Sequence, residues 1–302
     1  MGPTLSLPRS SGLASGPAVA QLGPPLPPSV TAQLQIGPGD DPGWALASQY
    51  LELKRELRST ELRERARRIA AQAILRRAAH VLGASRRSTR PAREPYSAPD
   101  RGELDPEATL EEGGGWSDPR PENLVVEVRE ERRVSVALML DTSLSMTGKK
   151  LALAGVAAAV LALRLDVRDY AVVLFSTRAH VIKRLRQHLP VERVLERLLD
   201  VPALGYTNIE DGLRVGYEEL AQGRTRHRFG IILTDGVATE GGDPRPWAAR
   251  YPGLHVLIAE DYKMDVALCR EMARLGRGQS YLVESYDRLP AVMRDLTLRL
   301  AG

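Results

Sequence analysis

From residue 123 onward the chain alternates between short apolar runs and longer amphipathic runs, and this alternation restricts the fold more than any other feature. Residues 134–140 are apolar except for Ser135, which is typical of a strand buried on both faces of a parallel sheet. Most of the amphipathic runs are about ten residues or longer, as expected of helices that connect parallel strands. The expected strands span residues 134–140, 170–175, 179–185, 229–233, 255–259 and 280–283, and the expected helices span residues 149–165, 191–199, 209–221, 266–275 and 291–300.

This order predicts an α/β fold. We expect a doubly wound, mostly parallel central sheet with helices on both faces. Residues 170–175 and 179–185 are joined by a short turn at Ser176 and Thr177, so we expect the second of these strands to be an antiparallel edge strand. The predicted α/β domain covers residues 123–302.

Composition divides the preceding part of the chain into three segments. Residues 1–42 are rich in Pro and Gly, and such a segment cannot bury enough apolar surface to offset chain entropy, so we expect a disordered leader. Residues 43–84 place apolar residues three and four apart among Arg and Glu, which predicts an amphipathic, Arg-rich helical arm. Residues 85–122 again hold many Pro and Gly, and we expect a linker with a short helical turn at 105–112.

The helical arm is expected to break near Ser59 and to restart with Thr60 as a helix cap, because acidic residues follow in the next turn. Its basic character has two interpretations. The arm packs on the main domain and keeps its charged face in solvent, or it docks onto an acidic partner. The arginines concerned are Arg63, Arg65, Arg67, Arg68, Arg76, Arg77, Arg86, Arg87, Arg90 and Arg93.

Several classes of protein are disfavoured by composition. The formal net charge of +4 is mild, and residues 63–93 lack aromatic residues for base stacking, so we expect no nucleic-acid partner. No apolar run reaches the roughly 18 residues that a membrane-spanning helix needs. We therefore expect no membrane association. Cys269 is the single cysteine and cannot form an internal disulfide, so we expect a cytoplasmic protein.

Oxygen-bearing side chains follow two of the predicted strands and one loop. Asp141, Ser143 and Ser145 come directly after the first buried strand, and Asp235 follows the strand at 229–233. Thr207 lies between them, in the loop Gly-Tyr-Thr-Asn-Ile that leads into a helix. Ligands of open α/β sheets bind at the carboxyl ends of the strands. The carboxylate and hydroxyl oxygens suit a hard divalent cation, which we expect to be Mg²⁺ or Mn²⁺.

These three segments, in this order, resemble the metal-ion-dependent adhesion site of von Willebrand factor A domains over roughly residues 130–300. The resemblance implies that Ser143, Ser145 and Thr207 contact the ion, and that Asp141 and Asp235 hold it largely through water and hydrogen bonds. It also implies that a partner's Asp or Glu completes the coordination. Tyr206 stands where many family members have Gly, which puts the shape of this loop in doubt.

The resemblance extends to one branch of the family. The Arg-rich helical arm ahead of the domain is similar to the bacterial CoxE-like proteins that partner MoxR-type AAA+ ATPases. This implies a non-enzymatic adaptor that assists an ATPase in maturing a client protein or inserting its metal or cofactor. A stand-alone binding or scaffold module without an ATPase is the alternative.

Other sites are disfavoured by the residues themselves. Gly148 and Lys149 resemble part of a phosphate loop, but Lys150 stands where a Ser or Thr is required. Ser143 lacks the glycines of a nucleophile elbow, so hydrolysis is not expected. Cys269 is expected to be buried and inert. Two further interpretations of the metal site remain: the aspartates only cap turns or helices, or the fold carries a degenerate site without metal.

Overall fold

The computed structural model describes the parts of the chain that hold the helices and strands. The described residues are 34–36, 42–83, 89–96, 103–112, 123–131, 133–143, 148–201, 205–259, 263–283 and 286–301. The predicted leader, residues 1–42, therefore lies almost entirely outside the described residues. Among the described residues, no helix combines the length and the apolar character needed to cross a bilayer.

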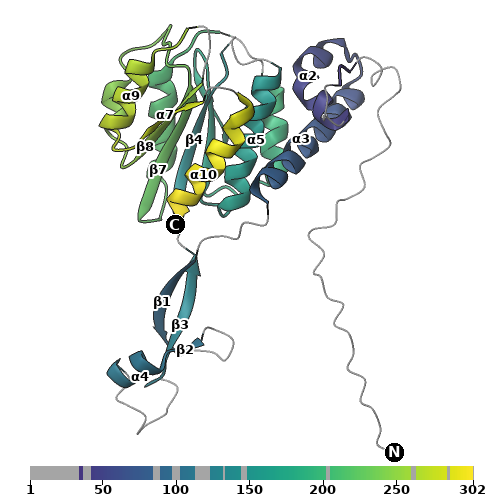
Figure 1. Ribbon diagram of the computed structural model, residues 1–302. Coiled ribbons are helices and arrows are strands. Elements are labelled where there is room, and N and C mark those ends of the chain that lie inside the picture. Colours follow the sequence, from purple (N-terminus) through teal and green to yellow (C-terminus); the bar gives the residue numbers. More distant parts are fainter. Residues whose placement is uncertain are drawn as a thin grey trace, which may run out of the picture.

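A central sheet of six strands forms the middle layer of the molecule (Figure 1). The strands are β4 (Val134–Asp141), β5 (Tyr170–Phe175), β6 (Ala179–Lys183), β7 (His227–Thr234), β8 (Leu254–Ala259) and β9 (Ser280–Val283). Their order across the sheet is β6-β5-β4-β7-β8-β9, and only the β5–β6 pair is antiparallel. The predicted fold class is therefore confirmed, including the antiparallel edge strand, which ends at Lys183, before the expected residue 185.

Helices cover both faces of this sheet, because successive residues of each strand point to opposite faces. On β4, Leu138 and Leu140 belong to one apolar core, while Ala137 and Met139 belong to the other. The first core is formed with α5 (Lys149–Arg164), α6 (Val191–Asp200) and α10 (Leu289–Ala301), which follows the short 3-10 helix η2 (Tyr286–Arg288). The second is formed with α7 (Ile209–Ala221), α8 (Arg245–Ala248) and α9 (Val266–Leu275).

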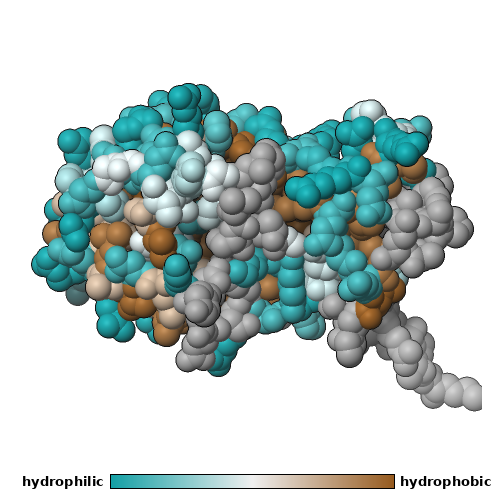
Figure 2. Space-filling model, turned by 90° about the horizontal axis from the view of Figure 1, so that it is seen from above, coloured by the Kyte–Doolittle hydropathy of each residue, from teal (hydrophilic) through white to brown (hydrophobic). Residues whose placement is uncertain are grey.

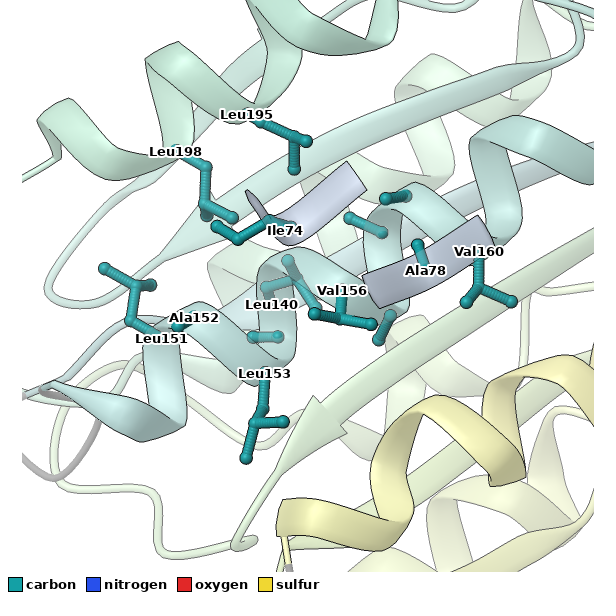
Figure 3. Packing of buried hydrophobic residues seen from close by; sticks show 14 of the residues in the cluster. Ile74, Ala78, Leu140, Leu151, Ala152, Leu153, Val156, Val160, Leu195 and Leu198 are labelled. Atoms are coloured by element: carbon teal, nitrogen blue, oxygen red, sulfur yellow. The ribbon is translucent and has the colours of Figure 1, made fainter. Parts of the chain in front are cut away.

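The arm forms two helices, α2 (Pro42–Glu56) and α3 (Thr60–Leu82), that extend the first core by packing against α5 and α6 (Figure 1). Ile74 of α3 points toward Leu195 and Leu198 of α6, beside α5 (Figure 3). The contact is close because α5 has a glycine there: a Cβ on Gly155 would lie 3.2 Å from both Ile74 Cδ1 and Leu198 Cδ2. The arm thus packs on the α/β domain by its small and apolar residues.

Ion pairs and a cap complete the arm. Lys54 and Arg67 both pair with Asp200, the last residue of α6. Ser59 caps α3, since its hydroxyl accepts a hydrogen bond from the Leu62 N–H at 3.4 Å. The expected cap, Thr60, is instead the first helical residue, because Ser59 holds the extended backbone that a cap requires.

Residues 89–131 contain a small second sheet where a linker was expected. Strands β1 (Thr89–Pro95) and β2 (Glu103–Leu104) both pair antiparallel with β3 (Val125–Glu131). Helix α4 (Pro106–Glu112) packs on β3, where the Thr109 hydroxyl accepts from the Val125 N–H at 3.0 Å. The prolines of β1 argue against a strand, because proline has no N–H to donate to a neighbouring strand. β1 lies at the edge of this sheet, where a missing N–H donor is tolerated. This sheet projects from the end of the domain at which β4 begins (Figure 1).

Candidate metal centre

Two aspartates meet at the end of the central sheet where the parallel strands terminate, which we call the carboxyl end. Asp141 is the last residue of β4, and Asp235 directly follows β7. The two strands are parallel neighbours, with Leu140 opposite Leu233, so Asp141 lies at the level of Thr234, one residue before Asp235. This is the upper end in Figure 1, and Figure 2 looks down on it, showing mostly hydrophilic residues with smaller hydrophobic patches among them.

Asp141 is held by hydrogen bonds to both of its carboxylate oxygens. Its Oδ1 accepts from the Ser143 N–H at 2.9 Å, and its Oδ2 accepts from the Thr234 hydroxyl at 3.1 Å. The residue is only 3% exposed. Burial raises the pKa of Asp141 to about 6, and the negative charge of Asp235 acts in the same direction, while the hydrogen bonds from Ser143 and Thr234 lower it. The charges of Asp141 and Asp235 therefore oppose each other across this site.

The Thr207 loop is attached to the segment that follows Asp235. The Thr207 N–H donates to the Thr239 hydroxyl at 2.8 Å, and the Thr207 carbonyl accepts from the N–H groups of Thr239 and Glu240 at 3.0 and 3.2 Å. Asp235 is fixed in turn, because its Oδ1 accepts from the Val237 N–H at 2.9 Å. These bonds connect the second and third segments of the predicted site.

The first segment joins the Thr207 loop through the end of β5. The Thr142 N–H donates to the Phe175 carbonyl at 2.8 Å, and the Asn208 N–H donates to the Ser176 carbonyl at 2.9 Å. Phe175 and Ser176 are consecutive residues. The neighbours of Asp141 and of Thr207 are thus bonded to adjacent peptide groups, which brings the three segments together at one end of the sheet.

Gly205 shapes the loop in which Tyr206 departs from the family pattern. Its φ of +95° lies in the left-handed region, and a Cβ at this position would lie 2.4 Å from Thr177 Oγ1. That same hydroxyl oxygen accepts from the Tyr206 N–H at 3.1 Å. Tyr206 is 65% exposed, so its ring points away from the loop's own contacts. The described part of the loop is therefore held by Thr177, while the Tyr206 side chain is exposed.

Four of the five predicted ligands can be located. Asp141, Ser143 and Thr207 are buried, with 3%, 6% and 6% exposure, and Asp235 is half-buried beside them. Ser145 lies outside the described residues. Sequence reasoning missed three supporting hydroxyls, those of Thr177, Thr234 and Thr239. Only Thr234 carried a local signal, because it directly precedes Asp235 at the end of a strand.

The donor set fits a hard dication. The described residues supply two carboxylates and two buried hydroxyls, and oxygen ligands of this kind suit Mg²⁺ or Mn²⁺. Asp141 and Asp235 disfavour each other's charge, and a bound cation removes that repulsion. No group of three or more His, Cys, Asp or Glu residues gathers as metal ligands anywhere in the described part of the chain, so this site depends on hydroxyls beside its two carboxylates.

Comparison with known proteins assigns the fold. Residues 136–237, which run from β4 to just after Asp235, match the family model described as von Willebrand factor type A domain. The chain contains a von Willebrand factor type A domain. An uncharacterized protein of Synechocystis sp., sll0103, is 33% identical over 140 residues, which cover 44% of this chain and 31% of that protein. The chain thus spans less than a third of the length of this relative.

Solved structures of similar shape include BatB from Bacteroides thetaiotaomicron, a conserved hypothetical protein. It is 18% identical, with a TM-score of 0.45, over 56% of this chain and 98% of that one. Proximal thread matrix protein 1 from the mussel byssus, with a zinc-occupied MIDAS motif, is 18% identical, with a TM-score of 0.48. The match covers 57% of this chain and 46% of that one. Such similarity adds no functional argument, and the assignment of the von Willebrand factor type A domain rests on the family match and the sheet.

Two further residues near the site have structural roles. Cys269 is buried, as expected, and burial raises the pKa of its thiol to about 12, with the charges of Asp265 and Asp235 acting in the same direction. Asp211 accepts from the Ala179 N–H at 2.7 Å and pairs with Arg214. It therefore connects α7 to the start of β6.

Proposed function

We propose that the carboxyl end of the sheet binds a protein partner through a divalent cation, Mg²⁺ or Mn²⁺, held by Asp141, Ser143, Ser145, Thr207 and Asp235. The observation that carries this proposal is the convergence of Asp141, Asp235 and the Thr207 loop through shared backbone hydrogen bonds at the ends of neighbouring strands.

A bound cation supplies an electrophilic position that a partner's Asp or Glu carboxylate completes. The chain's own residues prepare that position. Thr234 and the Ser143 N–H orient the Asp141 carboxylate, and Thr239 fixes the backbone of Thr207. Because only two carboxylates face the ion, little surplus negative charge remains to repel an acidic partner.

We further propose that the chain is an adaptor and not an enzyme. The 302 residues hold no complete phosphate-binding loop, so nucleotide hydrolysis would come from a partner. The helical arm ahead of the domain supports a role beside a MoxR-type AAA+ ATPase that matures a client protein. The second candidate is a stand-alone binding module, and the family match to the domain alone is equally consistent with it.

Calorimetry tests the metal site. We expect the chain to take up Mg²⁺ or Mn²⁺, and Asp141→Ala to weaken uptake at least a hundredfold, because it removes one of two carboxylates. Asp295→Ala is the matched control, since Asp295 is an exposed carboxylate on α10 that pairs with its neighbour Arg294. No heat of binding in the unaltered chain, even with an acidic peptide present, would contradict the site.

Affinity purification from the source cells separates the two functions. Recovery of an AAA+ ATPase in Mg²⁺, lost in a chelator and with Asp141→Ala but kept with Asp295→Ala, supports the adaptor. Metal-dependent recovery of other proteins without any ATPase supports the stand-alone module. Phosphatase or peptidase activity of the purified chain that disappears with Asp141→Ala would refute the non-enzymatic role.

A further inference from the structure

A basic hollow lies at the opposite end of the central sheet, where the parallel strands begin. Its volume is about 510 Å³, within the usual range for ligand pockets. Five arginines line it: Arg133, Arg168, Arg186, Arg224 and Arg226. They come from four separate segments, which precede β4, β5 and β7 or follow β6. We define the basic hollow by these five residues.

Negative charge in the basic hollow is scarce. Asp169 is the one carboxylate among the residues that line it, and it pairs with Arg133 at 2.9 Å. Within the described residues, no carboxylate forms an ion pair with the other four arginines. Like charges held close together repel each other, so this arrangement favours an anionic ligand that can neutralise several guanidinium groups.

The walls of the basic hollow are ordered by backbone and hydroxyl contacts. The Arg186 N–H donates to the Arg168 carbonyl at 2.9 Å, which holds two of the segments together. The Thr225 hydroxyl is 2.8 Å from the Ser135 hydroxyl and donates to the His227 carbonyl at 2.8 Å. The arginines therefore extend from fixed backbone positions.

Arg186 occupies a position that favours glycine. Its φ is +65°, in the left-handed region, where a side chain costs of order 1 kcal/mol. Favourable interaction with the negative end of a helix would account for Arg224, which follows α7 closely, but it does not account for Arg186 in a turn after a strand. Arg186 therefore adds its charge to the basic hollow from a turn whose backbone lies in the left-handed region.

We propose that the basic hollow docks an acidic segment of a partner protein, rich in Asp and Glu. Arginine forks match carboxylates in bidentate geometry, and an extended segment can reach several separated guanidinium groups at once. A compact phosphate fits less well, because the five arginines stand on four separate segments and a single small ion would neutralise fewer of them than an extended segment would. A nucleic acid fits less well because the hollow lacks Phe, Tyr and Trp for base stacking.

Fluorescence anisotropy with a labelled ten-residue Asp/Glu peptide tests this surface in the full chain. EDTA is present throughout, so that a cation at the carboxyl end cannot bind the peptide. We expect binding that weakens with salt, and a loss of at least tenfold with Arg168→Glu and Arg224→Glu together. The control is Arg68→Glu with Arg76→Glu, which makes the same charge change on exposed positions of the arm. We expect the control to weaken binding less than twofold.

Three outcomes would overturn the proposal. They are the absence of peptide binding, an equal or greater loss in the arm control, and stronger competition by oligothymidylate or inorganic phosphate than by unlabelled peptide. Circular dichroism and thermal melting establish that each variant is folded. If the variant with Arg168→Glu and Arg224→Glu does not fold, the variant with Arg168→Gln and Arg224→Gln replaces it. A loss of peptide affinity below threefold in that variant would contradict the proposal.

Discussion

The two ends of the central sheet use opposite chemistry. At the carboxyl end, carboxylates and hydroxyls are buried or half-buried and fixed by hydrogen bonds, as for Asp141, which is 3% exposed. At the other end, the arginines of the basic hollow extend into solvent, as for Arg133, whose side chain is 60% exposed. The eight residues of β4 separate the two ends by roughly 25 Å.

This contrast shows how one sheet can present two unlike surfaces. Parallel strands all end on one side, so residues after the strands converge there, while residues before the strands converge on the other side. A site for a single cation needs a few oxygens in fixed positions. A surface for an acidic segment needs many positive charges that can adjust. An adaptor that joins two proteins can use both surfaces at the same time.

The largest effect that we expect concerns Lys183, a buried lysine at the end of the sheet that carries the basic hollow. Its ammonium donates to the Tyr170 carbonyl, and burial lowers its pKa from 10.5 to about 8, although the charges of Asp166, Glu219 and Asp169 oppose this shift. Between these pH values the unfolded chain binds more protons than the folded chain, so folding stability rises with pH.

We therefore expect the stability of the unaltered chain, relative to Lys183→Met, to rise by up to about 3 kcal/mol between pH 8 and 10.5. Below pH 8 the ammonium is charged in the folded and in the unfolded chain, so the full cost of its burial is present there. Urea unfolding of both proteins at several pH values measures the difference. Parallel stability profiles would show that burial of the ammonium carries no such cost.

At the carboxyl end, Thr234→Val tests the support of Asp141. The change removes the hydroxyl that donates to Asp141 and accepts from the Gly236 N–H at 3.1 Å, with little change of shape. We expect metal affinity to fall about 10- to 100-fold and stability to fall by about 2 kcal/mol. Thr297→Val is the control, because Thr297 is a buried threonine on α10 whose hydroxyl bonds within its own helix. Equal metal affinity in both variants would contradict the role of Thr234.

Gly205→Ala tests whether loop shape limits the metal site. The new Cβ would lie too close to Thr177 Oγ1, and the alanine would have to keep the positive φ of Gly205. We therefore expect a stability loss of about 1–3 kcal/mol and weaker metal uptake. Gly83→Ala also places a side chain at a positive φ, +58°, but with nothing within 4 Å of the new Cβ, so it tests backbone strain without a steric contact. Calorimetry with Mn²⁺ should find uptake unchanged for Gly83→Ala, and a loss shared by both variants would exclude a local effect at the site.

The smallest effect is expected for Arg186→Gly in the basic hollow. Relief of the left-handed strain should stabilise the fold by about 0.5–1 kcal/mol, while binding of an acidic peptide weakens. Arg277→Gly is the comparison, because Arg277 has a φ of +55° but donates to the Tyr251 carbonyl at 2.7 Å. Thermal melting should show a gain for the first variant and none for the second. A loss of stability with Arg186→Gly would show that its side chain serves the fold.

Much of the domain could be predicted because its signals are local. The helices at 209–221 and 266–275 lie where periodicity places them, since each apolar face is visible within its own segment. Asp141 and Asp235 could be placed at one end of the sheet because each follows a buried apolar strand. Thr177 and Thr239 could not be found in this way, because their bonds to the Thr207 loop span 29 and 32 residues.

The sequence alone determined the alternation of strands and helices, the end of the sheet at which Asp141 and Asp235 lie, and the amphipathic arm, because these depend on neighbouring residues. Only the tertiary structure decided that β1 pairs with β3 despite its prolines, and that scattered arginines share one hollow. In the sequence each of those arginines is an ordinary surface charge. They become a surface only because strand order places distant loops side by side, and that order is set by packing across the whole sheet.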